Sequence, residues 1–307
     1  MKATSSCHGA ATIITAFATG KGGAYGIGLE NRTTVELHGS GGVASLVNGE
    51  SSGVKLAEAA VKRTLERFNV EFTGAKVTTE SDIPLAAGLK SSSVAANAIV
   101  LATIGAIASE RGEIKSLRLS KTRSEQEIII DDCKVQDEEL INIGIDAAYD
   151  AKVTVTGALD DASAAYFGGY TLTDNLKRSI IYRGGMEETL KVMIYLPEGR
   201  IKSGEIDPQK VKPFAKDIDL LWESARAGRI CSAITLNGLI HSLAFKQSPE
   251  PAIKALEAGA IAAGLSGTGP AVVALTRDDG KAVREAWSYL EGGIIETTIN
   301  NGKAMIL

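Results

Sequence analysis

The spacing of hydrophobic and polar residues changes several times along the chain and predicts strands that alternate with helices. Over the first 50 residues, short β-branched runs are interrupted by glycine, which is typical of strands joined by tight turns. From Leu56 to Phe68 the apolar residues recur at helical spacing, and Lys62, Arg63 and Glu66 lie on the opposite face. We therefore expect a β-rich start followed by an amphipathic helix.

An alanine-rich apolar run from Val94 to Ala108 follows a predicted strand at 75–84. The run is shorter than a membrane span and contains Asn97 and Thr103, so we interpret it as a buried core helix. The same periodicities predict the remaining elements. These are a helix at 138–151, a strand at 152–157, a small-residue helix and a strand within 157–175, a strand at 191–197, a long helical region at about 208–245, a helix, glycine turn and strand within 251–276, a helix at 280–292 and a closing strand at 293–299.

The order of these elements predicts an α+β protein with two domains. A chain of 307 residues is long enough to form two hydrophobic cores. Its second half has the order strand, helix, helix, strand, helix, strand, which indicates an α+β sandwich. We expect the boundary between residues 170 and 190, with a first domain at 1–175 and a second at 176–307.

The composition restricts the class of partner. A formal charge of −4 argues against a nucleic-acid or anionic-membrane surface, because both require a positive excess. The three cysteines and three histidines are spaced neither as a disulfide framework nor as a zinc site. The N-terminal stretch lacks the apolar segment of a cleavable signal. We therefore expect a soluble, cytoplasmic protein that binds a small molecule and has no nucleic-acid or membrane partner.

The segment PLAAGLKSSSVAANAIVLA, from Pro84 to Ala102, is the first candidate for chemistry. It places Gly88 in a turn after a strand and serine hydroxyls in the first turn of a long helix. Unpaired N–H groups and the partial positive charge of a helix N-terminus stabilise an anion such as phosphate. Lys90 adds a charge beside it. The alternative is an ordinary serine N-cap with a tight turn, and the residues alone leave both readings open.

Two further segments could contribute to a site. In LSGTGPAVVAL, Gly267 and Gly269 flank Thr268 in a turn that can approach a ligand closely or simply connect a helix to a strand. In ALDDASAAYFGG, Asp160 and Asp161 enter a helix of small and aromatic residues. Either acid is a good N-cap, but a carboxylate among apolar neighbours is also a candidate general base.

Taken together and in this order, the three segments resemble the GHMP kinase superfamily. Its signature P-x(3)-G-L-x-S-S-A is matched at Pro84, Gly88, Leu89, Ser91 and Ser92, with Ser93 where alanine is usual. Lys90 stands where many members have glycine. The turn SGTGPAV resembles the C-terminal glycine turn of the superfamily, and the helix that ends at Gly168 and Gly169 resembles the segment that carries a catalytic aspartate in several members.

The resemblance implies a fold and a set of functional residues. The implied fold is α+β with two domains, an N-terminal domain like domain 2 of ribosomal protein S5 and a C-terminal ferredoxin-like sandwich. It implies ATP and Mg²⁺ as cofactors and Asp161, rather than Asp160, as the catalytic aspartate. The implied ATP-binding residues are Pro84, Leu85, Ala86, Ala87, Gly88, Leu89, Lys90, Ser91, Ser92, Ser93 and Val94. The implied substrate-binding residues are Gly267, Thr268 and Gly269, and Lys21 is added as a candidate for its charge. The implied metal ligands are Ser91, Ser92 and Asp150, with Asp146 as the competing acid.

A narrower resemblance, over essentially the whole chain, is to shikimate kinases of the archaeal type. It is carried by ATGKGGAYGI (18–27), VTVTGALDDASAAYFGGYTLTDN (153–175) and AGAIAAGLSGTGPAV (258–272). It implies transfer of the γ-phosphoryl group of ATP to the 3-hydroxyl of shikimate by a monomer or homodimer. The alternatives are a kinase for another small alcohol such as homoserine or mevalonate, a decarboxylase of a phosphorylated mevalonate, and a nucleotide-binding protein without catalysis.

The first motif of the family departs from its usual form here. Many members place a lysine or arginine in it, but the corresponding stretch in this chain is His8-Gly9-Ala10-Ala11. A substrate carboxylate should need a cation, and Lys21, Arg32 and Arg123 are available for that role. The sequence does not select among these three.

Overall fold

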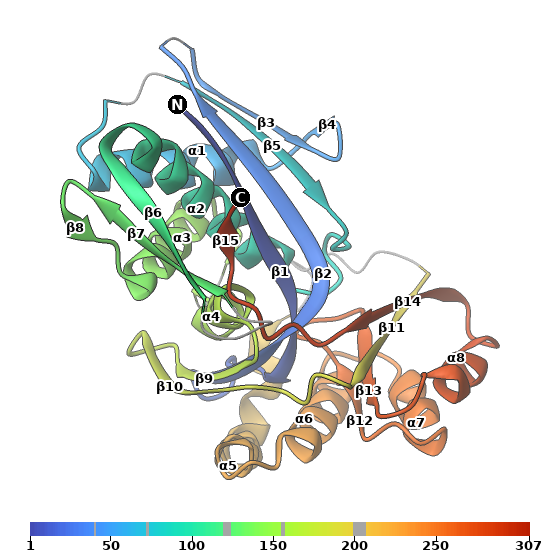
Figure 1. Ribbon diagram of the computed structural model, residues 1–307. Coiled ribbons are helices and arrows are strands. Elements are labelled where there is room, and N and C mark those ends of the chain that lie inside the picture. Colours follow the sequence, from blue (N-terminus) through green and yellow to red (C-terminus); the bar gives the residue numbers. More distant parts are fainter. Residues whose placement is uncertain (40, 72–73, 119–123, 155–156, 199–206) are drawn as a thin grey trace.

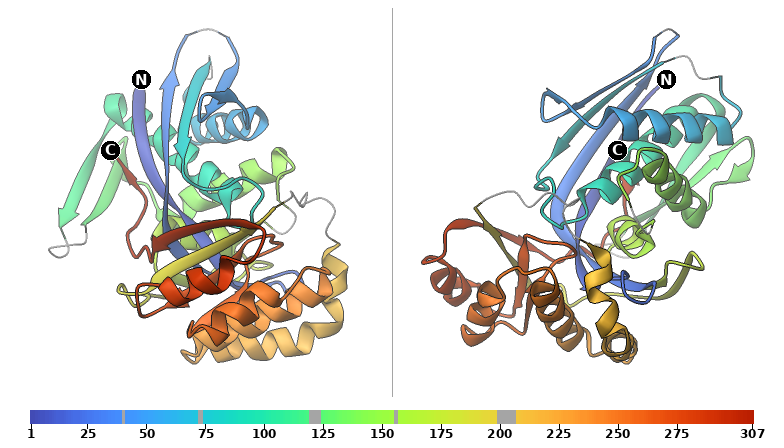
Figure 2. Two further views of the ribbon diagram at one scale, coloured as in Figure 1. Left: turned by 90° about the vertical axis from the view of Figure 1, so that its right-hand side faces the viewer. Right: turned by 180° about the vertical axis from the view of Figure 1, so that it is seen from behind.

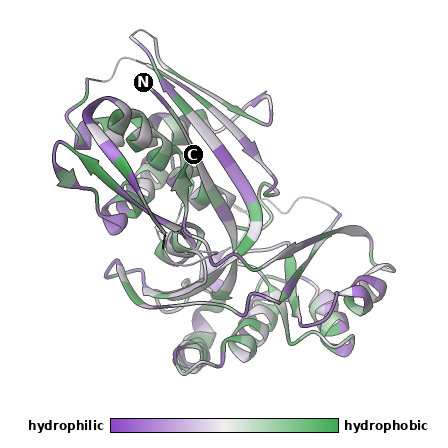
Figure 3. Ribbon diagram, viewed as in Figure 1, coloured by the Kyte–Doolittle hydropathy of each residue, from purple (hydrophilic) through white to green (hydrophobic). Residues whose placement is uncertain are grey.

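Two long antiparallel strands, β1 (Lys2–Ile14) and β2 (Lys21–Leu37), form the centre of the first sheet (Figure 1). The computed structural model describes residues 1–39, 41–71, 74–118, 124–154, 157–198 and 207–307. Buried residues alternate with more accessible ones along β2 from Leu29 onward, because one face lies against helices and the other faces solvent. Figure 3 accordingly shows hydrophobic and hydrophilic residues side by side on these two strands.

Further strands extend this sheet to eight. One edge of β2 pairs with β9 (Tyr170–Asp174) near its start and with β5 (Ala75–Ser81) near its end. The last strand, β15 (Met305–Ile306), pairs with β1, so the end of the chain returns to the first domain. The remaining strands of the sheet are β3 (Val43–Val47), β4 (Glu50–Ser51) and β10 (Ser179–Gly184).

Four helices pack together on one face of this sheet (Figure 2). Central among them is α2 (Ser91–Arg111), which is long and apolar enough to cross a membrane by length and composition. Its residues from Val94 to Ala108 are nearly all buried against β1, β2 and the neighbouring helices, so the protein interior covers its apolar surface. The prediction of a core helix is confirmed. The other three are α1 (Val54–Arg67), α3 (Asp137–Asp150) and α4 (Leu159–Phe167).

The second sheet has four antiparallel strands in the order β12 (Ala262–Leu265), β13 (Val272–Thr276), β11 (Lys191–Pro197) and β14 (Gly292–Thr298). With its helices this sheet has the β-α-β-β-α-β arrangement of a ferredoxin-like domain. The two-domain α+β fold is therefore confirmed. The helical elements of this half are the 3₁₀ helix η2 (Pro208–Phe214), α5 (Ala215–Arg226), α6 (Ile230–Ala244), α7 (Glu250–Glu257) and α8 (Lys281–Trp287).

Two features differ from the expected pattern. The strands β6 (Gly112–Arg118), β7 (Ser124–Ile130) and β8 (Cys133–Lys134) form a separate three-stranded sheet, which was not expected. The strand expected at 152–157 is wrong for its described residues 152–154, which continue from a turn at the end of α3, and 155–156 lie outside the described residues. The change from the first sheet to the second falls between β10 and β11, and the domain boundary at residue 175 stays a prediction.

Candidate active site

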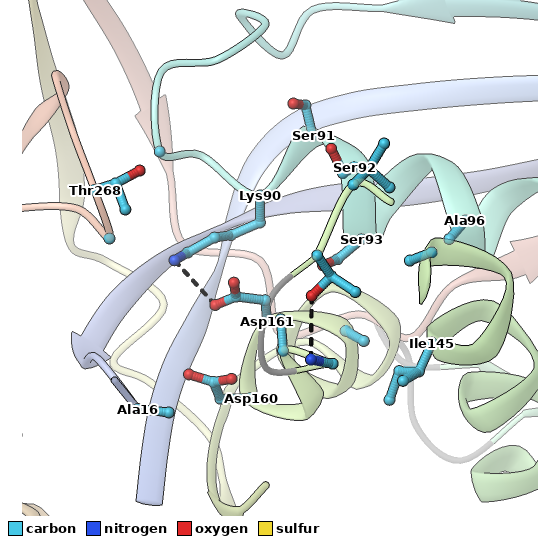
Figure 4. Close-up of a pocket in the computed structure, with 18 of the residues that line it drawn as sticks. Ala16, Lys90, Ser91, Ser92, Ser93, Ala96, Ile145, Asp160, Asp161 and Thr268 are labelled. Atoms are coloured by element: carbon cyan, nitrogen blue, oxygen red, sulfur yellow. Dashed lines mark hydrogen bonds and ion pairs between the residues drawn. The ribbon is translucent and has the colours of Figure 1, made fainter. Parts of the chain in front are cut away.

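A cavity of about 600 Å³ lies where the loop after β5, the start of α4 and the glycine turn between β12 and β13 meet. Figure 4 shows side chains from these segments converging on it. The cavity therefore brings together the three segments that the sequence singled out. Its lining includes Thr15, Ala16, Phe17, Leu85, Ala86, Gly88, Lys90, Ser91, Ser92, Ser93, Asn97, Gly144, Lys152, Thr154, Asp160, Asp161, Gly267 and Thr268.

The loop between β5 and α2 is docked onto the glycine turn of the second domain. Gly88 has a φ of 82°, and a Cβ at this position would overlap the backbone carbonyl of Ser266. The Ser266 hydroxyl donates to the Gly88 carbonyl at 2.8 Å, and the Ala271 N–H donates to the Ala87 carbonyl at 3.1 Å. A glycine is required at residue 88 because only glycine combines this backbone conformation with so close an approach.

The start of α2 does not have the serine N-cap that was considered as an alternative. The N-cap residue is Lys90, in the left-handed conformation with a φ of 68°, and no side chain caps the helix there. That alternative is wrong, because Ser91, Ser92 and Ser93 are already the first three helical residues. Their backbone N–H groups precede the first intrahelical hydrogen bond, which runs from Val94 N to the Lys90 carbonyl at 3.0 Å. An open helix N-terminus with three hydroxyls therefore borders the cavity.

Lys90 reaches across the cavity to the first turn of α4. Its Nζ lies 2.9 Å from Asp161 Oδ1, and the two side chains are only 8% and 18% exposed (Figure 4). The contact is an ion pair without hydrogen-bond geometry, since Asp161 Oδ1 accepts no hydrogen bond from the described residues. Lys90 thus compensates the charge of a buried carboxylate oxygen of Asp161.

The glycine turn makes room for this ion pair. Gly267 has a φ of 60°, and a Cβ there would lie 2.8 Å from Lys90 Nζ. Gln247 anchors the turn, because its Nε2 donates to the Thr268 carbonyl at 2.7 Å. The glycine turn of the second domain therefore leaves space for the side chain of Lys90, from the first domain, to contact Asp161.

Asp160 is the second acid that lines the cavity, and it is buried. Burial, and after it the negative charge of Asp161, raises the pKa of Asp160 to about 7, while Lys90 and a hydrogen bond from Asn175 oppose the rise. The Asp160–Asp161 sequence therefore carries less than two full negative charges near neutral pH.

Several residues proposed from the sequence lie away from the cavity. Lys21 pairs with Asp219 at 2.7 Å and is not among the residues that line the cavity. Arg32 pairs with Glu30 on the surface, and Arg123 lies outside the described residues. Among the described basic residues, Lys90 and Lys152 line the cavity.

The two acids considered as metal ligands lie on the outer side of α3. Both Asp150 oxygens accept hydrogen bonds from Arg63, at 2.6 and 2.9 Å, and these bonds lower the pKa of Asp150. Asp146 accepts from Arg178 at 2.7 Å. Neither acid lines the cavity that contains the serines.

The polar groups that line the cavity fit a metal ion that binds together with a ligand, rather than a metal ion held by protein side chains alone. Within the described ranges no group of three or more His, Cys, Asp or Glu side chains could hold a metal ion. Mg²⁺ bound to a nucleotide takes most of its ligands from phosphate oxygens and water and needs only one or two from the protein. Ser91 and Ser92 line the same cavity and can supply these.

Some lining residues were missed by reasoning from the sequence. The turn after β1 contributes Thr15 and Phe17, and α3 contributes Gly144. Lys152, with a φ of 58°, follows the end of α3 and also lines the cavity. Only the positive φ at Lys152 is unusual locally, and it is a property of the fold; nothing in the sequence around these residues marks them.

Comparison with protein families defines the class of this chain. The model of the GHMP kinase N-terminal domain matches residues 55–169, and the model of the GHMP kinase C-terminal domain matches residues 244–290. Among solved structures, a homoserine kinase from Cytophaga hutchinsonii superposes with a TM-score of 0.69 at 15% identity, covering 100% of this chain and 97% of that one. The mevalonate kinase of Methanococcus jannaschii gives 0.69 at 17% identity, covering 97% and 98%. The fold is thus that of the GHMP kinases.

Full-length relatives narrow this class. The shikimate kinase of Methanothermobacter thermautotrophicus is 39% identical over 308 aligned positions, which cover 100% of this chain and 99% of the relative. That of Methanothrix thermoacetophila is 40% identical over 305, covering 99% and 96%. The chain belongs to the GHMP kinase family, in the branch formed by these archaeal shikimate kinases.

Proposed function

We propose that this protein is a shikimate kinase that transfers the γ-phosphoryl group of ATP to the 3-hydroxyl of shikimate. The identity of nearly 40% to shikimate kinases over the full length supports the substrate. The ion pair between Lys90 and Asp161, beside an open helix N-terminus, supports phosphoryl transfer as the reaction. This reaction requires positioning and charge neutralisation above all. We further propose that it acts in the cytoplasm, as a monomer or homodimer.

In this proposal the phosphates of ATP lie along the loop from Pro84 to Val94. The backbone N–H groups of Ser91 to Ser93 face them, and the positive φ at Ala86 and Gly88 shapes the loop around them. Mg²⁺, bound with the nucleotide, would be held by Ser91 or Ser92, and it would neutralise phosphate charge.

Asp161 acts on the attacking hydroxyl. The oxygen of the 3-hydroxyl forms a bond to the γ-phosphorus while the bond from phosphorus to the bridging oxygen breaks, and ADP leaves. The hydroxyl proton passes to the Asp161 carboxylate. Lys90 holds this carboxylate in place and stands beside the helix N-terminus, where it stabilises the charge on the transferred group. Gly267 to Gly269 form the floor between shikimate and the phosphates.

The test is a shikimate-dependent ADP-release assay on the wild type and Asp161→Asn, with homoserine and mevalonate as competing acceptors. We expect ADP release with shikimate alone among these acceptors. Turnover should fall by about 10²-fold or more in Asp161→Asn, while ATP affinity stays within about twofold. Release with homoserine or mevalonate instead would assign the substrate to another GHMP kinase reaction, and near-normal turnover of the variant would remove Asp161 from its role.

Two other outcomes would replace the proposal. ATP-dependent release of CO₂ from a phosphorylated mevalonate would identify a decarboxylase. Binding of Mg-ATP without turnover on any alcohol would identify a nucleotide-binding protein without catalysis.

A further inference from the structure

The proposed phosphoryl transfer does not account for the presence of Asp160 in the cavity. Its side chain is buried, with the residue 4% exposed, yet it lines the same cavity as Asp161. In Figure 4 the carboxyl of Asp161 lies toward Lys90, whereas that of Asp160 lies toward Ala16 in the turn after β1. The two acids thus face different parts of one cavity.

The Asp160 carboxyl is held in one orientation by neighbouring strands. Asn175 Nδ2 donates to Asp160 Oδ1 at 2.8 Å, and Thr173 Oγ1 donates to Asn175 Oδ1 at 2.7 Å. On the other side the carboxyl lies against Gly22 of β2, where any Cβ would overlap Asp160 Oδ2. A chain of buried polar groups and a glycine therefore fix this acid, as is usual for residues that must meet a ligand in a defined geometry.

No direct ion pair among the described residues neutralises the charge of the Asp160 carboxylate. Among the described residues no lysine or arginine forms an ion pair with Asp160, since Lys90 pairs with Asp161 and Lys21 with Asp219. A buried carboxyl without a cationic partner is costly and is seldom kept for structure alone. A carboxyl oxygen that lines the cavity can accept a hydrogen bond from a ligand hydroxyl.

We propose that Asp160 determines acceptor specificity by hydrogen bonding to the 4-hydroxyl of shikimate. The inference rests on the proposed function, in which the 3-hydroxyl meets Asp161. Asp160 and Asp161 are consecutive residues, so their carboxyls reach two sites that a single small molecule can span. Of the two ring carbons beside C3, only C4 carries a hydroxyl, which makes the 4-hydroxyl the group next to the reacting oxygen.

The experiment compares shikimate with 4-deoxyshikimate in the wild type, Asp160→Asn and Asp174→Asn. Asp174→Asn is the matched control, because Asp174 ends β9 next to Asn175, pairs with Lys177 and does not line the cavity. In the wild type, removal of the 4-hydroxyl should lower kcat/KM by about tenfold or more. In Asp160→Asn, KM for shikimate should rise by about tenfold, KM for ATP should stay within about twofold, and the two acceptors should become nearly equivalent. Asp174→Asn should keep the wild-type ratio.

If Asp160→Asn discriminates between the two acceptors as well as the wild type does, the assignment is wrong. Should this variant fail to fold, Asn175→Ala provides a second test, since it keeps the acid but removes its anchor. A folded Asn175→Ala protein should show a raised KM for shikimate with KM for ATP unchanged, and an unaltered KM for shikimate would also overturn the inference. A wild type that does not phosphorylate shikimate would instead refute the proposed function, so the two failures are distinguishable.

Discussion

Lys90 Nζ lies 2.9 Å from Asp161 Oδ1, and this contact joins the loop before α2 to the first turn of α4. Lys90 makes it from a left-handed backbone conformation with a φ of 68°, which is unfavourable for any residue other than glycine, asparagine or aspartate. Strained residues that persist in a fold are concentrated at functional sites. The contact therefore indicates that this lysine is retained for its charge.

Replacing Lys90 should separate backbone strain from catalysis. Lys90→Gly removes both the strain and the ion pair, whereas Lys90→Met removes the ion pair alone. We expect Lys90→Gly to be more stable than Lys90→Met by about 1 kcal/mol in chemical denaturation. Both variants should lose turnover by about 10²-fold or more in the ADP-release assay. Equal stability would show that the φ of residue 90 costs nothing, and retained turnover would remove Lys90 from the reaction.

Gly267 is expected to affect turnover through Lys90. A Cβ at residue 267 would lie 2.8 Å from Lys90 Nζ, so Gly267→Ala should push the ammonium away from Asp161. The control is Gly259→Ala, because Gly259 also has a positive φ, of 95°, but nothing lies within 4 Å of a Cβ there. Both variants should lose about 1–2 kcal/mol of unfolding free energy. Only Gly267→Ala should lose turnover, by about tenfold or more, and comparable turnover in the two variants would contradict the steric argument.

Asp150 provides a test of the metal ligand implied by the family resemblance. Its carboxylate is engaged by Arg63 at the surface and lies outside the cavity. Asp150→Asn should therefore leave the Mg²⁺ concentration for half-maximal activity within about twofold of the wild type and cost less than about 1 kcal/mol of stability. A large increase in the Mg²⁺ requirement would instead mean that Asp150 leaves Arg63 and serves the metal.

Stability at acid pH should depend on His241. This histidine is buried on α6, and its Nδ1 lies 2.8 Å from the Asn237 carbonyl oxygen. Burial lowers the pKa of His241 to about 4; the hydrogen bond to Asn237 opposes this change and the charge of Lys90 adds to it. The unfolded chain binds a proton near pH 6.5, so the folded state loses up to about 3 kcal/mol as the pH falls from 6.5 to 4.

The measurement is the free energy of unfolding against pH for the wild type and His241→Leu. The variant should lack this part of the acid loss, and substitution of the exposed His38 by Gln is the control that should retain it. A wild-type curve that does not change between pH 6.5 and 4, or one that His241→Leu leaves unaltered, would contradict the prediction.

Much of the fold follows from local patterns in the sequence. The helical spacing from Leu56 to Phe68 predicted α1 to within two residues at its start, and the apolar run after Ser93 predicted the buried part of α2. These elements are predictable because periodicity and burial are properties of neighbouring residues. The sheet of β6, β7 and β8 was missed, since its strands carry charged residues and little apolar alternation.

The candidate site was only partly predictable. The sequence by itself determined that a serine loop, an acidic helix start and a glycine turn are present and in the order of the GHMP kinases. Only the tertiary structure decided which charged groups meet: Lys90 contacts Asp161, while Lys21 and Asp150 pair with Asp219 and Arg63. The physical reason is that ion pairs form between side chains distant in sequence, and their partners depend on how the strands, helices and two domains pack.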